Sequence, residues 1–280
     1  MSFLSAIMEQ SFLQHALLGG LLASIGCGVV GSFVVVRRIG YMAGGIAHAI
    51  LGGMGLAYFL GKQPMTGALI SAIGAAIIIS KVSQRHNNNG RQQEDTIISA
   101  LWAVGMSAGI LFIAKTPGYN VDLMSYLFGN ILMISTHDLN MIALLDTTVI
   151  LFTVLFFKQL LTICYDSEFA KLRGIKVETF NTLLLCMVAI TVVILIQIVG
   201  LILVIAMLTL PAATARLWVN TMPAMMFLAC IAGAIVSSCG LILSYHYDLP
   251  TGATTALLAG LTFLLTIVTT DLLHRFSRHH

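Results

Sequence analysis

Long apolar runs alternate with short polar breaks along the chain. A helix that crosses a bilayer needs about 20 mostly apolar residues, and this length divides the chain into nine candidate spans. They cover residues 14–36, 42–60, 65–81, 96–114, 137–157, 179–198, 200–218, 222–243 and 252–273. Only Gly200 separates the sixth span from the seventh. The pattern predicts an all-α polytopic membrane protein with one domain, residues 1–280; nine spans are preferred and eight are the alternative.

Composition agrees with this class of protein. Hydrophobic residues make up 58% of the chain and charged residues 9%, whereas soluble domains carry roughly 25% charged residues. No basic n-region precedes the first apolar run, and Glu9 interrupts it, so we expect the first helix to be retained rather than cleaved. No block of charge predicts nucleic-acid binding.

The basic residues predict the orientation of the chain. With nine spans, only Lys62 and Lys115 fall on one side of the membrane. The other side carries Lys or Arg at positions 37, 38, 81, 85, 91, 158, 171, 173, 176, 216, 275 and 278. Because cytoplasmic loops are enriched in Lys and Arg, we expect the N-terminus outside and the C-terminus in the cytoplasm.

Between the fourth and fifth spans, residues 116–130 precede an apolar run that ends at Ser135 and is too short to cross. A short re-entrant helix on the outer side fits this pattern. The outer side also carries polar groups that are either solvated loop ends or a relay that receives a cation. These residues are Asp122, His137, Asp138, His246 and Asp248.

An ionisable side chain, His48, lies inside the second apolar segment. Such a group is a functional-site hypothesis by default, and imidazole is a common metal ligand. Small residues flank it at helical spacing: Gly44 and Gly52 share its face, and Gly45, Ala49 and Gly53 repeat the pattern one position on. This bare face allows either close helix packing or a narrow path on which His48 binds a cation.

Asp146 lies about ten residues into the fifth span, near the middle of the membrane. This carboxyl group needs a partner or water. One hypothesis pairs it with His48 as a nitrogen and oxygen site suited to zinc or manganese. The alternative is a protonated core acid that makes a hydrogen bond.

Residues 159–178 form a cytoplasmic segment with the pattern of a short helix. Asp166 or Ser167 is a candidate N-cap and Gly174 a candidate C-cap. Phe169 and Leu172 then share a face beside the charges of Glu168 and Arg173. The pattern favours a docking surface for a soluble partner over a helix that lies on lipid headgroups.

Motifs for catalysis are missing from the sequence. The stretch from Gly55 to Gln63 comes nearest to a P-loop, but its spacing is wrong and it has no hydroxyl after Lys62. Hydrolase motifs such as H-E-x-x-H and G-x-S-x-G do not occur. We therefore expect a non-enzyme whose energy comes from another subunit or from an ion gradient. The five cysteines form no C-x-x-C pair and are interpreted as small core residues.

Three motifs occur in order: residues 37–49, with two arginines, a tyrosine and Ala-His-Ala; residues 121–129, VDLMSYLFG; and residues 210–216, LPAATAR. With them, nearly the whole chain resembles the membrane permease of zinc, manganese and iron ABC importers. The resemblance implies the type II importer fold of vitamin B12 transporters, a bacterial inner-membrane location and no permanently bound cofactor. The transported ion would be zinc, manganese or iron.

The same resemblance implies a homodimer, two cytoplasmic ATP-binding subunits and an extracytoplasmic solute-binding protein. It identifies the segment from Asp166 to Lys176 as the part that docks on the ATPase. In the family an acidic residue lies four positions before the histidine; here that position is Gly44. Asp146 is the hypothesised substitute.

Other functions remain open at this point. The absence of an acid at Gly44 suits a permease for a chelated metal or a cobalamin-like solute. An intramembrane His and Asp would also suit a proton-coupled secondary carrier. A structural membrane protein with packed glycine helices is the third alternative.

Overall fold

The computed structural model describes residues 9–85, 91–116, 129, 134–198, 200–201 and 204–277. Every regular element of these residues is a helix, which confirms the all-α prediction for this part of the chain. In order they are α2 (Ser11–Arg37), α3 (Gly40–Phe59), α4 (Pro64–Arg85), α5 (Arg91–Ala114), α7 (Thr136–Leu155), α8 (Phe157–Tyr165), α9 (Ser167–Leu172), α10 (Val177–Ile198), α11 (Val204–Trp218), α12 (Met222–Tyr247) and α13 (Thr251–Ser277).

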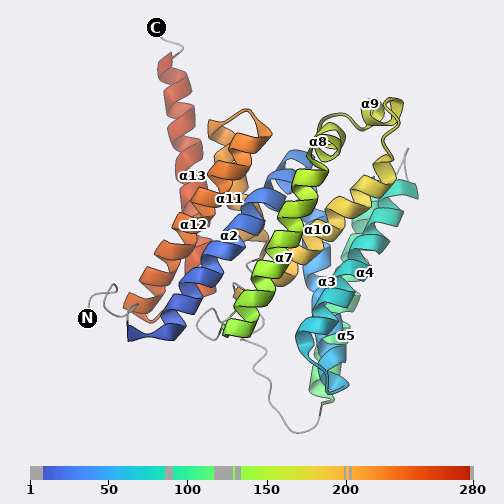
Figure 1. Cartoon of the computed structure of the whole chain (residues 1–280), viewed down its shortest axis with the longest axis vertical. Coiled ribbons are helices and arrows are strands. Elements are labelled where there is room, and N and C mark those ends of the chain that lie inside the picture. Colours follow the sequence, from blue (N-terminus) through green and yellow to red (C-terminus); the bar gives the residue numbers. More distant parts are fainter. Residues whose placement is uncertain are drawn as a thin grey trace.

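Within the described residues, eight helices are long and apolar enough to cross a membrane. These are α2, α3, α4, α5, α7, α10, α12 and α13. α11 has 15 residues and is shorter, yet it leads the chain up to the turn from which α12 descends (Figure 1). The start of α2 and the end of α13 consequently lie at opposite ends of the bundle, as the nine-span prediction requires.

Two turns depend on a left-handed backbone. Gly200 has φ +85° and separates α10 from α11 at the predicted break, because glycine adopts positive φ without a steric penalty. Arg38 has φ 60° and caps α2, and the Ile39 amide donates to the Val34 carbonyl at 3.1 Å. This cap reverses the chain directly into α3.

The helices form two groups joined by shared neighbours (Figure 1). α3 packs against α4 and α5 on one side, and α11, α12 and α13 pack together on the other. α2 contacts α7, α10, α11 and α12, and α10 also contacts α3 and α4. A continuous apolar core follows these contacts, with Phe33, Ile46 and Val204 among its fully buried members. The chain thus places α3 beside α5 and α7 beside α2.

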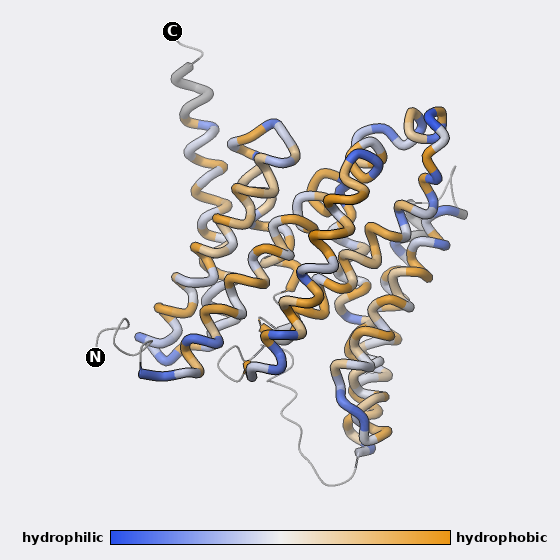
Figure 2. Tube along the Cα trace, viewed as in Figure 1, coloured by the Kyte–Doolittle hydropathy of each residue, from blue (hydrophilic) through white to orange (hydrophobic). Residues whose placement is uncertain are grey.

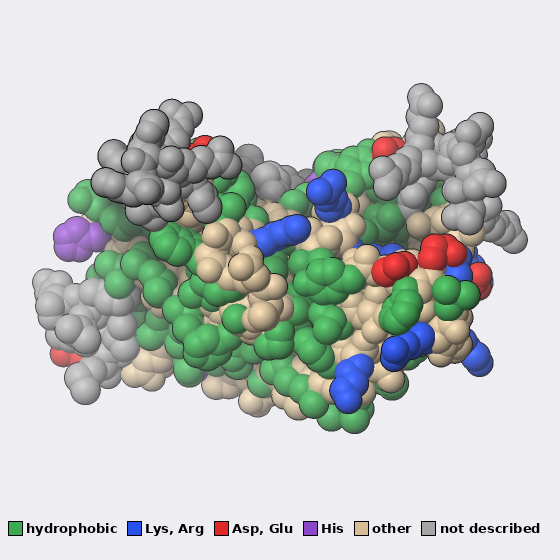
Figure 3. Space-filling view, turned by 90° about the horizontal axis from the view of Figure 1, so that it is seen from above, with side chains coloured by type: hydrophobic (Ala, Val, Ile, Leu, Met, Phe, Trp, Pro, Cys, Tyr) green, Lys and Arg blue, Asp and Glu red, His purple; other side chains and the backbone are tan. Residues whose placement is uncertain are grey.

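Polar residues gather at the helix ends and apolar residues fill the middle (Figure 2). The helix ends that carry most of the basic residues share the upper end of the bundle, which includes the ends of α2, α4 and α11 and the short helices α8 and α9. Figure 3 shows basic side chains on that face. Lys62 and Lys115 follow α3 and α5 at the lower end. Which end faces the cytoplasm stays a prediction.

The proposed re-entrant segment falls almost wholly on residues 117–128 and 130–133, which lie outside the described residues.

The core interpretation of the cysteines is correct for Cys27, which is buried, but wrong for Cys239, which is exposed on α12. Because the lateral surface of a membrane protein faces lipid, an apolar thiol such as that of Cys239 can lie there without being buried in the protein.

Candidate functional site

His48 lies in the middle of α3 and its side chain is 8% exposed. Its imidazole lies against the indole of Trp102 on α5, with ring centroids 3.8 Å apart and planes 48° apart. Among the described residues, Nδ1 of His48 has no hydrogen-bond partner. A buried polar atom normally has a partner, so this nitrogen is free to bind something that the chain itself does not supply.

The small residues around His48 bring three helices close together. A Cβ at Gly52 would lie 3.0 Å from the carbonyl oxygen of Gly105 on α5. Gly53 faces Gly67 and Ser71 of α4, and Gly45 faces Ile98 of α5. These contacts support the packing interpretation of the glycines, and they hold α3 between α4 and α5 with His48 inside the bundle.

Gly44 faces a filled space rather than an open one. A Cβ there would lie 3.0 Å from Cδ1 of Ile205 on α11 and 3.6 Å from Cζ3 of Trp102. The indole and the isoleucine therefore fill the space beside the position where the resemblance implies an acidic side chain.

Asp146 is 3% exposed on α7, and neither carboxyl oxygen has a hydrogen-bond partner among the described residues. The carboxyl group lies against Gly26 of α2: a Cβ at Gly26 would be 3.5 Å from Cγ of Asp146 and 3.6 Å from Cγ2 of Thr191 on α10. Asp146 thus belongs to the interface of α2, α7 and α10, and both of its carboxyl oxygens can still accept a hydrogen bond or bind a cation.

The structure brings His48 and Asp146 to different interfaces. His48 faces α5, whereas Asp146 faces α2 and α10, and α3 does not share a packed interface with α7 among the described helices. The described residues also contain no group of three His, Cys, Asp or Glu side chains arranged to hold a metal ion. The pairing of His48 with Asp146 stays a prediction, and it requires another conformation.

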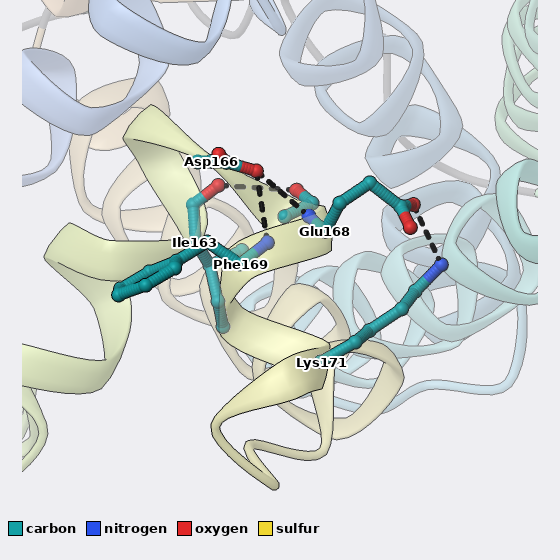
Figure 4. Close-up of polar contacts among 6 residues, drawn as sticks. Ile163, Asp166, Glu168, Phe169 and Lys171 are labelled. Carbon is teal, nitrogen blue, oxygen red and sulfur yellow. Dashed lines mark hydrogen bonds and ion pairs between the residues drawn. The ribbon is translucent and has the colours of Figure 1, made fainter.

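The segment 159–178, which the sequence predicts to be cytoplasmic, forms α8, α9 and the start of α10 (Figure 1). Asp166 is the N-cap of α9, and its Oδ1 accepts hydrogen bonds from the amides of Glu168 and Phe169, both at 3.0 Å (Figure 4). Gly174 has φ +75°, and its amide donates to the Lys171 carbonyl at 2.9 Å. The predicted N-cap at Asp166 is correct, whereas the C-cap is Arg173 and Gly174 is the left-handed residue directly after it. These ends matter because a helix of six residues has little stability of its own.

One face of α9 holds it to the protein and another faces outward. Ala170 is fully buried with Ile163 and Val177 in a small apolar cluster. Leu172 is 87% exposed and Phe169 44% exposed. Charged groups surround this outward face: the Arg173 guanidinium lies 4.9 Å from the centre of the Phe169 ring, and Lys171 pairs with Glu168 at 3.0 Å (Figure 4). An apolar face with a charged rim is typical of a protein-docking surface.

The first turns of α10, directly after this segment, are tied to the membrane helices. Nη1 of Arg37 donates to Oδ1 of Asn181 at 2.5 Å. Oγ of Ser80 on α4 and Oγ1 of Thr182 are 2.7 Å apart, and Nε2 of Gln84 donates to the Glu178 carbonyl at 3.0 Å. A displacement of α9 that moves the start of α10 would therefore also move the ends of α2 and α4 that are hydrogen-bonded to it.

The residues predicted to form an outer metal relay lie mostly at helix ends. Asp138 forms a capping box with Ser135 at the start of α7, where the Ser135 amide and hydroxyl donate to its Oδ2 at 3.0 and 2.7 Å. Asp248 has φ 53° and caps α12, while His137 and His246 are exposed. Asp122 lies outside the described residues. The helix-end interpretation explains Asp138 and Asp248, and a metal relay stays a prediction.

Sequence reasoning missed Trp102, which is the ring packed on His48. It also missed the hydrogen bond between Arg37 and Asn181, which are 144 positions apart in the chain. Trp102 is one of two tryptophans in the chain. It lies on α5, whereas His48 lies on α3, so only the fold brings the two rings together.

Comparisons with known proteins agree with this architecture. Residues 9–270 match the family model described as "ABC 3 transport family". A manganese transport system membrane protein of Halalkalibacterium halodurans is 36% identical over 94% of this chain and 89% of its own length. A manganese import system permease protein of Streptococcus parasanguinis is 32% identical over 94% and 92%.

A solved structure is also similar. PsaBC from Streptococcus pneumoniae, in complex with a Fab, contains a chain that is 33% identical and superimposes with a TM-score of 0.85 over 94% of both chains. The family model and the relatives cover the helices of both groups, the His48 site and the α9 segment. The chain therefore belongs to the ABC 3 transport family.

Proposed function

We propose that this chain is the membrane permease of an ATP-driven importer of a divalent transition metal, with manganese as the leading cargo. The observation that carries the proposal is the extent of the likeness: two relatives named for manganese transport or import each match 94% of the chain. Zinc and iron are the other cargo candidates that the sequence motifs imply.

The proposed assembly is a homodimer in the bacterial inner membrane. Two cytoplasmic ATP-binding subunits dock on it, and an extracytoplasmic binding protein delivers the metal. The absence of a P-loop from the sequence supports ATP hydrolysis in a separate subunit. The basic residues at the end of the bundle that carries α9 support a cytoplasmic location for that end.

His48 is the proposed cargo ligand of this chain. Its buried imidazole lies within the membrane and Nδ1 lacks a partner among the described residues. Neutral imidazole nitrogen suits zinc and iron, and carboxylate oxygen suits manganese. Asp146 is a second proposed ligand, reached in a state in which the α3 and α7 interfaces meet.

A transport assay tests the proposed function. The chain is reconstituted into proteoliposomes with its ATPase and binding protein, and uptake of manganese, zinc and iron is measured with and without ATP. We expect ATP-dependent uptake of at least one free ion that an uncoupler does not abolish. Uptake that collapses with an uncoupler and needs no ATPase would identify a secondary carrier instead.

A metal chelate and a cobalamin are included as cargoes in the same assay. The packed position at Gly44, where Ile205 and Trp102 fill the space, supports a bare ion over a bulky solute. We expect no uptake of either large solute. Uptake of the chelate alone would move the assignment to the chelated-metal alternative.

Leu172→Asp tests the docking surface. The leucine side chain is 87% exposed, so its replacement leaves the fold intact, whereas a carboxylate inside an apolar interface is costly when unpaired. We expect at least tenfold weaker binding of the ATPase, since loss of a buried interface anchor costs about 2 kcal/mol or more. Binding is measured by co-purification at increasing dilution.

Leu249→Asp is the matched control, because Leu249 is 49% exposed and lies between α12 and α13. This junction is at the end of the bundle opposite α9 (Figure 1). It should leave ATPase binding unchanged. Equal binding by wild type and Leu172→Asp would remove α9 from the docking surface.

A further inference from the structure

Trp102 of α5 covers the candidate ligand. Its indole is the aromatic ring that lies against His48, at 3.8 Å between centroids, and it also reaches the space in front of Gly44. With Ile205 it closes the side of His48 on which a residue four positions earlier would project. A metal ion therefore cannot approach this side of the imidazole while the indole stays in place.

The backbones around Trp102 are closely packed. One helical turn after Trp102, a Cβ at Gly105 would lie 2.6 Å from Cα of Ala49, the residue next to His48. One turn before it, the hydroxyl of Ser99 is hydrogen-bonded to Tyr41 at 2.5 Å. α5 is thus held against α3 on both sides of the indole. Rotation of one side chain opens this site at a smaller loss of contacts than separation of the two helices would.

We propose that Trp102 is a gating residue for the metal site: its indole covers His48 in this state and turns aside when a metal ion enters. The proposal rests on the assignment of His48 as a cargo ligand. In this proposal Trp102 controls how readily a metal ion reaches the site, whereas His48 binds the ion. The gate is intrinsic to one chain, because both rings and the packed glycines belong to the same protomer.

Removal of the indole should expose the site permanently. When a binding-competent state is populated at about 10 per cent, the apparent affinity is about tenfold lower than the intrinsic affinity. Trp102→Ala should therefore bind manganese about tenfold more tightly than wild type, and Trp102→Phe should lie between the two. The measurement is the loss of the free manganese signal by electron paramagnetic resonance, with MnCl2 added to the full chain in lipid nanodiscs.

Trp218→Ala is the matched control. It makes the same truncation at the chain's other tryptophan, which is 56% exposed at the end of α11, and should leave manganese binding unchanged. His48→Ala, added to Trp102→Ala, should abolish the gain. Binding by Trp102→Ala that equals or falls below that of wild type would overturn the gate, since the indole would then support the imidazole or have no role.

A second measurement leaves the site intact and does not depend on how well Trp102→Ala folds. Trp218→Phe makes Trp102 the only tryptophan, so its fluorescence reports on the indole directly. MnCl2 should change this emission, and His48→Ala should remove the change. An emission that saturating manganese leaves unaltered would overturn the gate. The transport assay tests the proposed function separately. If the complete importer takes up metal but manganese leaves the Trp102 emission unaltered, the proposed function is retained and only the gate is rejected.

Discussion

His48→Ala should abolish metal uptake by the assembled importer and leave the importer assembled. The imidazole is 8% exposed and Nδ1 is unpartnered among the described residues, so alanine removes the proposed ligand and breaks no hydrogen bond that the structure records for this nitrogen. Loss of a residue that only supports a metal ligand costs about 10 to 100-fold in affinity, and loss of the ligand should cost at least as much. The measurement is uptake of radioactive manganese into proteoliposomes.

His15→Ala is the histidine control for this experiment. His15 lies on α2, where its Nδ1 is 3.2 Å from the Ile134 carbonyl oxygen, and its loss should cost at most about one hydrogen bond of stability without loss of uptake. Asp146→Asn is measured alongside and should lower uptake if both residues bind the cargo. Normal uptake by Asp146→Asn with none by His48→Ala would end the joint-ligand hypothesis, and normal uptake by His48→Ala would end the ligand assignment itself.

Gly67→Ala should destabilise the folded chain strongly. The added Cβ would lie 2.6 Å from Cβ of Ala57 and 2.9 Å from the carbonyl carbon of Gly53, and a backbone atom cannot rotate away as a side chain can. Overpacking typically costs about 1–3 kcal/mol, and we expect the upper end here. At roughly 2–4 °C per kcal/mol for a chain of this size, the midpoint of thermal unfolding in detergent should fall by about 6–12 °C.

Gly74→Ala is the matched control on the same helix. Its Cβ would meet no atom within 4 Å, and alanine favours a helix over glycine by about 1 kcal/mol. The thermal midpoint of this variant should be unchanged or slightly higher. Equal midpoints for the two variants would show that α3 and α4 are not held as closely as Gly53 and Gly67 indicate.

The helices could be predicted because membrane spans carry their signal locally. Every span of the nine-span division corresponds to a helix of the described structure, and the break at Gly200 falls between α10 and α11. The N-cap of α9 at Asp166 and the left-handed Gly174 just past its C-terminal end were predictable for the same reason, since capping depends on residues within one or two turns. The length of α11 was not predictable. The apolar pattern gave a span over residues 200–218, whereas the helix covers 15 residues and begins at Val204.

The candidate site was predicted only in part. The sequence identified His48 and Asp146 as buried polar groups, and both are buried without hydrogen-bond partners among the described residues. It did not show that Trp102 covers His48 or that Ile205 fills the space at Gly44. These contacts join α3 with α5 and α11, and no periodicity within one helix encodes which helix will be its neighbour.

The sequence by itself determined the class of protein, the helical segments, the capped helix α9 and the polar residues inside the apolar spans. These follow from composition, from the length of apolar runs and from short-range hydrogen bonding. The tertiary structure alone decided that His48 faces α5 while Asp146 faces α2 and α10, and that Arg37 ties α2 to Asn181 of α10. The physical reason is that nearly every face of a membrane helix is apolar, so hydrophobicity does not select its partners. Close packing at small residues such as Gly52 and Gly105 does, and that fit exists only between helices that the fold has already brought together.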